Sequence, residues 1–299
     1  MKIEDKLEIV IPTFNRCEKL GITFSYLLDE NSPVKNCDIT ILDNCSTDDT
    51  PNLVKKIAEK HPNVKYQRNA RNIGSFGSIV RGFEIASKEY LWELGDNDTY
   101  DWKYFDDVLK AIKNEADVVI VGYGICKKKP KDPRICVLQP GGADVWPLLI
   151  WRRDNISDAI FRMLSFYQLY HPVILLSVLL INAKPNLNVV LADGNIVKWT
   201  PILFKERKKD YERYFMMDNR VNAYSPMVSL CMCREKGLRD EALRGYLDSS
   251  YLPSFLRGLF LKDDFKVCWV VLAVLPWKFK FYLLAVGLLM SFKRVVQKV

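Results

Sequence analysis

The first 125 residues alternate between short apolar runs and longer segments in which apolar positions recur three or four residues apart. The short runs are rich in β-branched residues and predict strands, whereas the longer segments predict amphipathic helices. The predicted strands are 7–14, 37–44, 63–69, 90–98 and 117–124. The predicted helices are 17–30, 46–61, 76–88 and 102–116. This alternation predicts an α/β fold with a mostly parallel sheet and helices on both of its faces.

Beyond residue 140 the pattern changes to apolar or amphipathic helical segments separated by Pro or Asn. The sequence Pro140-Gly141-Gly142 marks a plausible boundary. We therefore predict an α/β core over 1–140, a mainly helical region over 141–262 and a basic amphipathic tail over 263–299.

The tail combines aromatic residues with Lys and Arg and contains no acidic residue after Phe265. A membrane-spanning helix needs about 20 apolar residues, and Pro276, Lys278 and Lys280 divide this stretch into shorter runs. The pattern favours helices that lie in the headgroup region of an anionic membrane. The alternative is an ordinary hairpin in the core of the helical region.

The composition of the chain indicates its cellular compartment and argues against one class of partner. The N-terminus lacks the apolar core of a signal peptide, and the eight cysteines are scattered, which indicates a cytosolic protein with reduced thiols. The formal net charge is +8, but the basic clusters are short, so we predict no nucleic-acid partner.

Polar residues stand where the predicted strands end, which is where parallel α/β sheets bind ligands. These positions are Pro12-Thr13-Phe14, Asp43-Asn44 and Asp96-Asn97-Asp98. If the fourth strand continues to Asp98, side-chain alternation places Asp96 and Asp98 on one side and Asn97 on the other. Two carboxylates form half of a site for Mg²⁺ or Mn²⁺, with phosphate and water as the other ligands. The alternative is a polar turn that caps the following helix.

Two further segments suit a nucleotide. The Asp43 carboxylate can accept a hydrogen bond from the ring N–H of uracil, thymine or guanine. Arg71, Asn72 and Gly74 lie just before a predicted helix whose N-terminal N–H groups suit an anion. The segment does not match G-x-G-x-x-G, which argues against a dinucleotide-binding fold.

The segments "IVIPTFNR", "ILDNCSTDDT" and "RNIGSFGSIVRGFEIASKEYLWELGDND" resemble the N-terminal half of family-two glycosyltransferases of the GT-A fold. The "WELGDND" form resembles the bacterial branch that builds O-antigen and capsule polysaccharides, including abequosyltransferase-like enzymes. The resemblance covers roughly residues 6–125, and the rest of the chain matches only in general character.

The resemblance implies a role for each matched position. Thr13 and Asp43 would hold the base of a nucleotide-sugar, Asp96 would contact the ribose or a metal, and Asp98 would bind Mn²⁺ or Mg²⁺. The remaining predicted nucleotide-sugar contacts are Pro12, Arg71, Asn72, Gly74 and Asn97.

The resemblance also implies a hexosyl- or deoxyhexosyltransferase that inverts the anomeric centre, with a carboxylate as the base. Asp193 is the first candidate for this base and Asp218 the second, while Asp154 and Asp158 remain open. The implied donor carries UDP, or else dTDP or GDP, and the implied acceptor is a polyprenyl-diphosphate-linked oligosaccharide at the cytoplasmic face of the inner membrane. The alternatives are a sugar nucleotidyltransferase, which would need a Gly-rich loop after the first strand, and a catalytically degenerate membrane adaptor.

Overall fold

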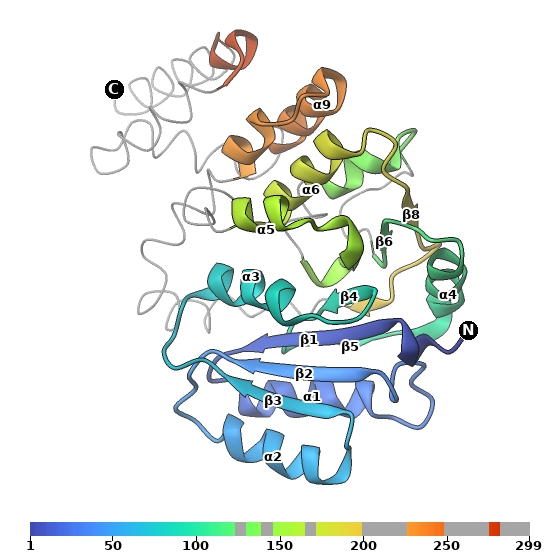
Figure 1. The fold of residues 1–299 in the computed structure, drawn as a ribbon, viewed down its shortest axis with the longest axis vertical. Helices are drawn as coiled ribbons and strands as arrows, with labels where there is room; N and C mark the ends of the chain where they lie inside the picture. Colours follow the sequence, from blue (N-terminus) through green and yellow to red (C-terminus); the bar gives the residue numbers. More distant parts are fainter. Residues whose placement is uncertain (123–129, 139–145, 165–171, 199–225, 248–274, 282–299) are drawn as a thin grey trace, which may run out of the picture.

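The computed structural model describes residues 1–122, 130–138, 146–164, 172–198, 226–247 and 275–281. The strands in chain order are β1 Leu7–Thr13, β2 Asp38–Asp43, β3 Val64–Arg68, β4 Tyr90–Glu93, β5 Thr99–Tyr100, β6 Val118–Ile120, β7 Leu149–Arg152, β8 Val189–Leu191 and β9 Val197–Lys198. The α-helices are α1 Cys17–Leu27, α2 Thr50–Lys60, α3 Ser75–Ile85, α4 Phe105–Lys113, α5 Asp158–Leu164, α6 Pro172–Ala183 and α9 Lys236–Leu247. Figure 1 shows α2 and α9 at opposite ends of the molecule.

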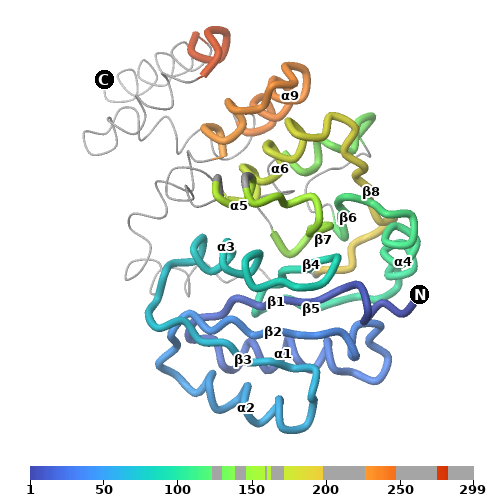
Figure 2. Tube along the Cα trace, in the orientation of Figure 1, coloured from blue at the N-terminus to red at the C-terminus, as the bar shows by residue number. Residues whose placement is uncertain are grey.

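The main sheet has seven strands in the order β3-β2-β1-β4-β7-β6-β8, and β5 pairs with β9 in a separate two-stranded sheet. All neighbours in the main sheet are parallel except those of β7, which runs antiparallel to β4 and β6. The tube in Figure 2 shows β7 between these two strands. The predicted α/β fold with a mostly parallel sheet is therefore confirmed.

Side-chain alternation along the strands gives the sheet two buried faces. In β1, Ile9 and Ile11 are buried in one apolar cluster with Phe24 of α1. Val10 points the other way, into a second cluster with Ile79 of α3. Apolar side chains on both faces explain why these strands are nearly continuous apolar runs.

The parallel register brings the strand ends to one edge of the sheet. Thr13 at the end of β1 is opposite Asp43 at the end of β2, and Asp43 is opposite Arg68 at the end of β3. Residues that are far apart in sequence therefore meet at the edge where a ligand is expected.

Among the described residues, three strands lie beyond residue 140, in the region for which the sequence pattern predicts mainly helices. Strand β7 has four residues, β8 has three and β9 has two. Runs this short show no periodicity of their own, so only their pairing with other strands reveals them. Within the described part of the chain, no helix is both long enough and apolar enough to cross a bilayer.

Candidate active site

The acidic turn after β4 forms the centre of the candidate site. Strand β4 ends at Glu93, and Asp96 and Asn97 lie in a turn. The prediction that a strand continues to Asp98 is therefore wrong, and period-two alternation does not apply to these residues. Asp96 and Asp98 are nevertheless both buried, with 8% and 1% of their surfaces exposed.

Gly95 makes room for the Asp98 carboxylate. A Cβ atom at Gly95 would lie 2.4 Å from Oδ2 of Asp98, well inside contact distance. The side chain of Asp98 therefore lies against the backbone of its own turn, in space that only glycine leaves open.

Asp96 is held from the end of β1. The Oγ1 hydroxyl of Thr13 donates a hydrogen bond of 2.8 Å to Oδ2 of Asp96, and Nε of Arg16 lies 3.8 Å from the same oxygen. Burial raises the pKa of Asp96 above its ordinary value, and the Arg16 charge and the Thr13 hydrogen bond only partly offset this effect.

The two carboxylates concentrate negative charge in the region beside β5. Tyr100 is buried there, and its ring stacks on Trp102 with 5.3 Å between centroids. Burial raises the pKa of Tyr100 well above its ordinary value, and the charges of Asp98 and Asp96 raise it further. A cation bound at the turn would neutralise this charge.

The chemistry of the donor set fits a hard divalent cation. Asp96 and Asp98 supply carboxylate oxygens, which Mg²⁺ and Mn²⁺ prefer, and such ions usually take one or two carboxylates together with phosphate and water. Within the described residues, no group of three or more His, Cys, Asp or Glu side chains could hold a metal by itself. A metal here would therefore take the rest of its ligands from a substrate and water.

Asp43 is held by several hydrogen bonds from the protein. Its fully buried carboxylate accepts hydrogen bonds from the backbone N–H of Ser46 at 2.8 Å, from the Tyr66 hydroxyl at 2.7 Å and from Nη1 of Arg68 at 2.6 Å. Burial and the adjacent Asp43 carboxylate raise the pKa of Tyr66. Asp43 therefore fixes the loop after β2, and its contact with a base stays a prediction.

Asn44 organises the segment before α3, a role that the sequence pattern did not reveal. Its Oδ1 accepts hydrogen bonds from the backbone N–H of Ile73 at 2.9 Å and from Nδ2 of Asn69 at 3.1 Å. Its Nδ2 donates to Oδ1 of Asn72 at 2.7 Å, and the same Asn72 oxygen accepts the N–H of Gly74 at 2.8 Å.

Arg71, Asn72 and Gly74 lie at the same edge of the sheet as Asp43. Arg71 and Asn72 are exposed, and Gly74 precedes α3 with a positive φ of 80° that favours glycine. Pro12 is half-buried opposite Leu42, beside this edge. The predicted nucleotide residues of the first three strands are therefore brought together, but their ligand contacts stay predictions.

Asp193 lies on the same side of the sheet as the acidic turn. It follows β8, and its backbone N–H donates to Oδ2 of Asp107 near the start of α4 at 3.0 Å. The chain then enters β9, where Lys198 pairs with Thr99, the residue after Asp98. The Asp193 side chain is exposed, and its role as a base stays a prediction, whereas Asp218 lies outside the described residues.

Sequence patterns also gave no sign of Glu93, a buried carboxyl on the last residue of β4. Its side chain faces α3, where a Cβ atom at Gly82 would lie 2.3 Å from its Oε1. Neither carboxyl oxygen has a hydrogen-bond partner among the described residues, and burial raises its pKa well above the ordinary value. Burial therefore favours the neutral, protonated form of this carboxyl.

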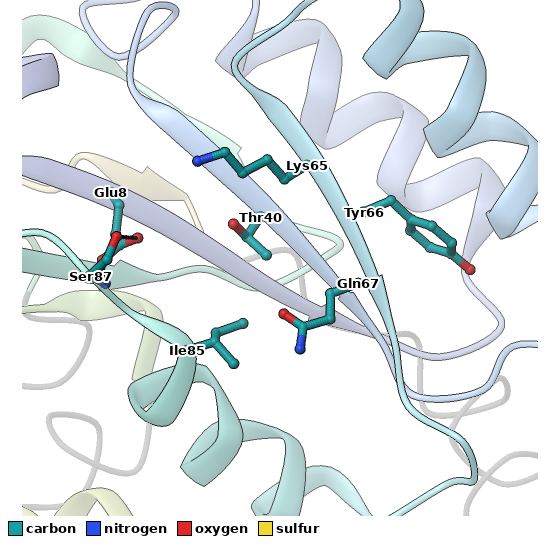
Figure 3. A pocket seen from close by; sticks show the side chains of 7 residues that line it. All are labelled: Glu8, Thr40, Lys65, Tyr66, Gln67, Ile85 and Ser87. Carbon is teal, nitrogen blue, oxygen red and sulfur yellow. Dashed lines mark hydrogen bonds between the residues drawn. The ribbon is translucent and has the colours of Figure 1, made fainter.

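A separate groove of about 340 Å³ lies on the face of β1, β2 and β3 (Figure 3). Thr40 and Gln67 line it, whereas the Tyr66 ring points away from Thr40 (Figure 3). Glu8, another lining residue, already accepts the backbone N–H groups of Ser87 and Lys88. The groove therefore lies apart from the acidic turn and does not include its carboxylates.

Comparison with known proteins agrees with this geometry. The family model described as "Glycosyl transferase family 2" matches residues 8–150. That range contains the strand-end positions of β1, β2 and β3 and the acidic turn. Together with the sheet, the match identifies residues 8–150 as a family 2 glycosyltransferase domain with the GT-A fold.

Curated relatives are bacterial glycosyltransferases. Poly(ribitol-phosphate) beta-N-acetylglucosaminyltransferase TarP of Staphylococcus aureus is 26% identical over 170 residues, which cover 55% of this chain and 48% of TarP. GalNAc(5)-diNAcBac-PP-undecaprenol beta-1,3-glucosyltransferase of Campylobacter jejuni is 31% identical over 94 residues, 31% of this chain and 30% of that protein. Abequosyltransferase RfbV of Salmonella typhimurium is 24% identical over 115 residues, 38% of this chain and 34% of RfbV. The chain thus spans about half or less of the curated relatives that it matches.

Solved structures show the same fold. S. aureus TarS (residues 1–349) in complex with UDP-GlcNAc superposes with a TM-score of 0.61 at 15% identity, covering 91% of this chain and 82% of that one. A mannosyltransferase from Pyrobaculum calidifontis in complex with GDP-Man and Mn²⁺ superposes with a TM-score of 0.50 at 14% identity, covering 96% of this chain and 80% of that one. Their similarity extends the GT-A fold over most of the chain.

Proposed function

We propose that this protein is a metal-dependent, inverting glycosyltransferase that moves a sugar from a nucleoside diphosphate donor to a saccharide acceptor. The observation that carries the proposal is the pair of buried carboxylates, Asp96 and Asp98, at the carboxyl edge of the sheet in a family 2 glycosyltransferase domain. Its curated relatives named above are glycosyltransferases, which supports the same class of activity.

The donor is a nucleotide-sugar bound across the ends of β1, β2 and β3. The base lies near Thr13, Asp43 and the exposed residues Arg71 and Asn72, while the N-terminus of α3 favours the negative charge of the donor. UDP is the first choice, because the TarS structures contain UDP-GlcNAc and UDP, and dTDP or GDP is the alternative.

Asp96 and Asp98 would hold Mn²⁺ or Mg²⁺. Once bound, the cation neutralises the charge that develops on the departing diphosphate. The chain itself supplies the positioning, since Thr13 fixes Asp96 and Gly95 leaves space for Asp98. The Mn²⁺ in the mannosyltransferase complex supports the choice of metal.

The transfer is a single displacement at the anomeric carbon. The acceptor hydroxyl oxygen forms the new bond from the face opposite the diphosphate, while the bond to the diphosphate breaks and its electron pair leaves with the nucleotide. The hydroxyl proton passes to a carboxylate that acts as general base. Asp193 is our first candidate for this base because it lies at the same side of the sheet as the acidic turn, and Asp218 is the second.

The acceptor is a polyprenyl-diphosphate-linked oligosaccharide in cell-surface polysaccharide synthesis, and we assign the recognition of this acceptor to the region 141–262. The undecaprenol-linked substrate in the name of the C. jejuni relative supports this acceptor class. The protein then acts peripherally at the cytoplasmic face of the plasma membrane.

Replacing one metal-binding carboxylate tests the proposal. Asp98→Asn keeps the shape of the side chain but removes its charge, so we expect Mn²⁺-dependent hydrolysis of the donor to fall at least about 100-fold, typical of losing one electrostatic contact in a transition state. Release of nucleoside diphosphate measures the rate, and circular dichroism checks the fold. Asp106→Asn, at an exposed acid in the first turn of α4, is the matched control and should leave the rate unchanged. Equal rates for Asp98→Asn and the wild type would refute the metal role.

A further inference from the structure

The segment 275–281 beside α9 presents apolar side chains on two faces. It is the short helix drawn in red in Figure 1, at the end of the molecule opposite α2. Leu275 and Phe279, four residues apart, are buried in the apolar cluster of α3 and α6, with 2% and 4% of their surfaces exposed. Trp277 and Phe281, also four residues apart, are 73% and 64% exposed. The segment is therefore anchored in the protein through one pair and turns the other pair outward.

The two outward rings are the most exposed large apolar side chains in the described part of the chain. Their centroids lie 6.1 Å apart, so they form one continuous patch. The other strongly exposed apolar residues are Met1, at the N-terminus, and Ile22, on α1. Single exposed apolar side chains are common on soluble proteins, but two adjacent exposed aromatic rings indicate a contact surface.

Lysines flank the rings. Nζ of Lys280 lies 4.9 Å from the centre of the Trp277 ring. Nζ of Lys278 lies 2.5 Å from Oδ2 of Asp240, a buried acid of α9, so this contact fixes the segment on α9. Burial alone would raise the pKa of Asp240, but the Lys278 and Arg239 contacts outweigh it and lower the pKa. The surface thus combines amphipathic rings with positive charge on a rigid support.

We propose that Trp277 and Phe281, with Lys280 beside them, form a surface that docks the protein on an anionic lipid bilayer. The Trp277 and Phe281 rings enter the headgroup region, and Lys280 contacts lipid phosphate while its alkyl stem lies against apolar surface. The net charge of +8 favours the same negatively charged occupant. This inference rests on the proposed function in that it gives the peripheral enzyme its contact with the membrane that carries the acceptor.

Vesicle flotation with the full chain tests the proposal. The vesicles are neutral phosphatidylcholine, or phosphatidylcholine with about one-third phosphatidylglycerol. We expect the wild type to float with the anionic vesicles and to be released by high salt, because anionic lipid attracts basic surface groups. The double variant Trp277→Ala/Phe281→Ala should bind the anionic vesicles at least about tenfold more weakly than the wild type does. Lys280→Gln should bind them about fivefold more weakly.

Ile22→Ala is the matched control, because it removes an exposed apolar side chain from α1 without touching the proposed surface. It should bind vesicles as the wild type does. Equal binding of the double variant and the wild type, or no binding of the wild type to anionic vesicles, would overturn the proposal. A change in the oligomeric state of the double variant, measured by light scattering, would also overturn it by showing that the surface contacts protein.

Failure here is distinguishable from failure of the proposed function. Thermal stabilisation by UDP and Mn²⁺ is measured on the same protein preparations and depends on the acidic turn. If UDP with Mn²⁺ stabilises the protein but the protein does not bind the vesicles, the glycosyltransferase proposal stands and the proposed membrane surface is refuted.

Discussion

At the scale of single residues, the site depends on carboxylates whose surroundings give them different roles. Asp43 carries three hydrogen bonds from the protein and fixes its loop. Asp96 has a raised pKa and one hydroxyl donor, so a bound cation would stabilise its charged form. Glu93 lies in the apolar layer against α3 and gains no such stabilisation.

Glu93 gives the protein a pH-dependent stability. Its folded-state pKa lies well above the ordinary value of 4.5, so between the two pKa values the folded protein keeps a proton that the unfolded chain releases. The free energy of unfolding should therefore fall as pH rises above about 4.5, by about 1.4 kcal/mol per pH unit until the folded-state pKa is reached. Glu93→Gln, which cannot ionise, should remove this decline and be more stable than the wild type at pH 8.

Urea unfolding at pH 5 and pH 8 measures this effect. Glu84→Gln is the control, since Glu84 is an exposed carboxyl on α3 whose nearest cation, on Arg81, is 3.7 Å away at the surface. It should change the pH dependence little. If Glu93→Gln shows the same decline as the wild type, the carboxyl does not titrate as a buried group.

At the scale of elements, two short connections position the site. The turn after β4 relies on Gly95, which leaves space for the Asp98 carboxylate. The loop before α3 relies on Asn44, whose amide binds four residues of that loop. Both connections are held by contacts from neighbouring strands, so the site is a product of the sheet and not of either loop alone.

Gly95→Ala should damage the site more than the fold. The added methyl would displace the Asp98 carboxylate, a side-chain end that can move, so we expect the free energy of unfolding to fall by only about 1 kcal/mol. The thermal shift caused by UDP with Mn²⁺ should be lost, because one metal ligand is displaced.

Gly237→Ala is the matched control for this substitution. Gly237 lies in α9, and an added Cβ would meet nothing within 4 Å. Alanine should stabilise that helix by up to about 1 kcal/mol and leave the nucleotide response unchanged. A full nucleotide response in Gly95→Ala would show that the carboxylate position does not matter.

These elements also show what the sequence could predict. The strands β1, β2 and β4 are largely apolar runs bounded by turn residues, and the parallel-sheet rule then places Thr13, Asp43 and the acidic turn at one edge. The end of β4 could not be predicted, because "YLWEL" is apolar except for Glu93 and reads as a strand that continues past Glu93, whereas the turn depends on Gly95. The hydrogen-bond partners of Asp43 could not be predicted from the sequence either, because Tyr66 and Arg68 reach Asp43 only through the pairing of β2 and β3.

At the scale of the whole molecule, the sheet connects the donor edge with the second half of the chain. Strands β7 and β8 extend the sheet beyond the first 140 residues, and β9 pairs with β5 next to Asp98. This pairing joins the segment that follows Asp193 to the residues that follow the acidic turn. Segment 275–281, at the end of the molecule opposite α2, supplies the surface for which we propose membrane contact (Figure 1).

The most direct test of the central claim is thermal unfolding with UDP, dTDP, GDP, CDP or ADP, each with and without Mn²⁺. A ligand present at 100 times its dissociation constant adds about 2.7 kcal/mol of stability. We expect a metal-dependent rise in the unfolding temperature with UDP, or else with dTDP or GDP, and none with CDP or ADP. No rise with any nucleotide, or a rise of equal size without metal, would contradict a metal-dependent nucleotide-sugar site at Asp96 and Asp98.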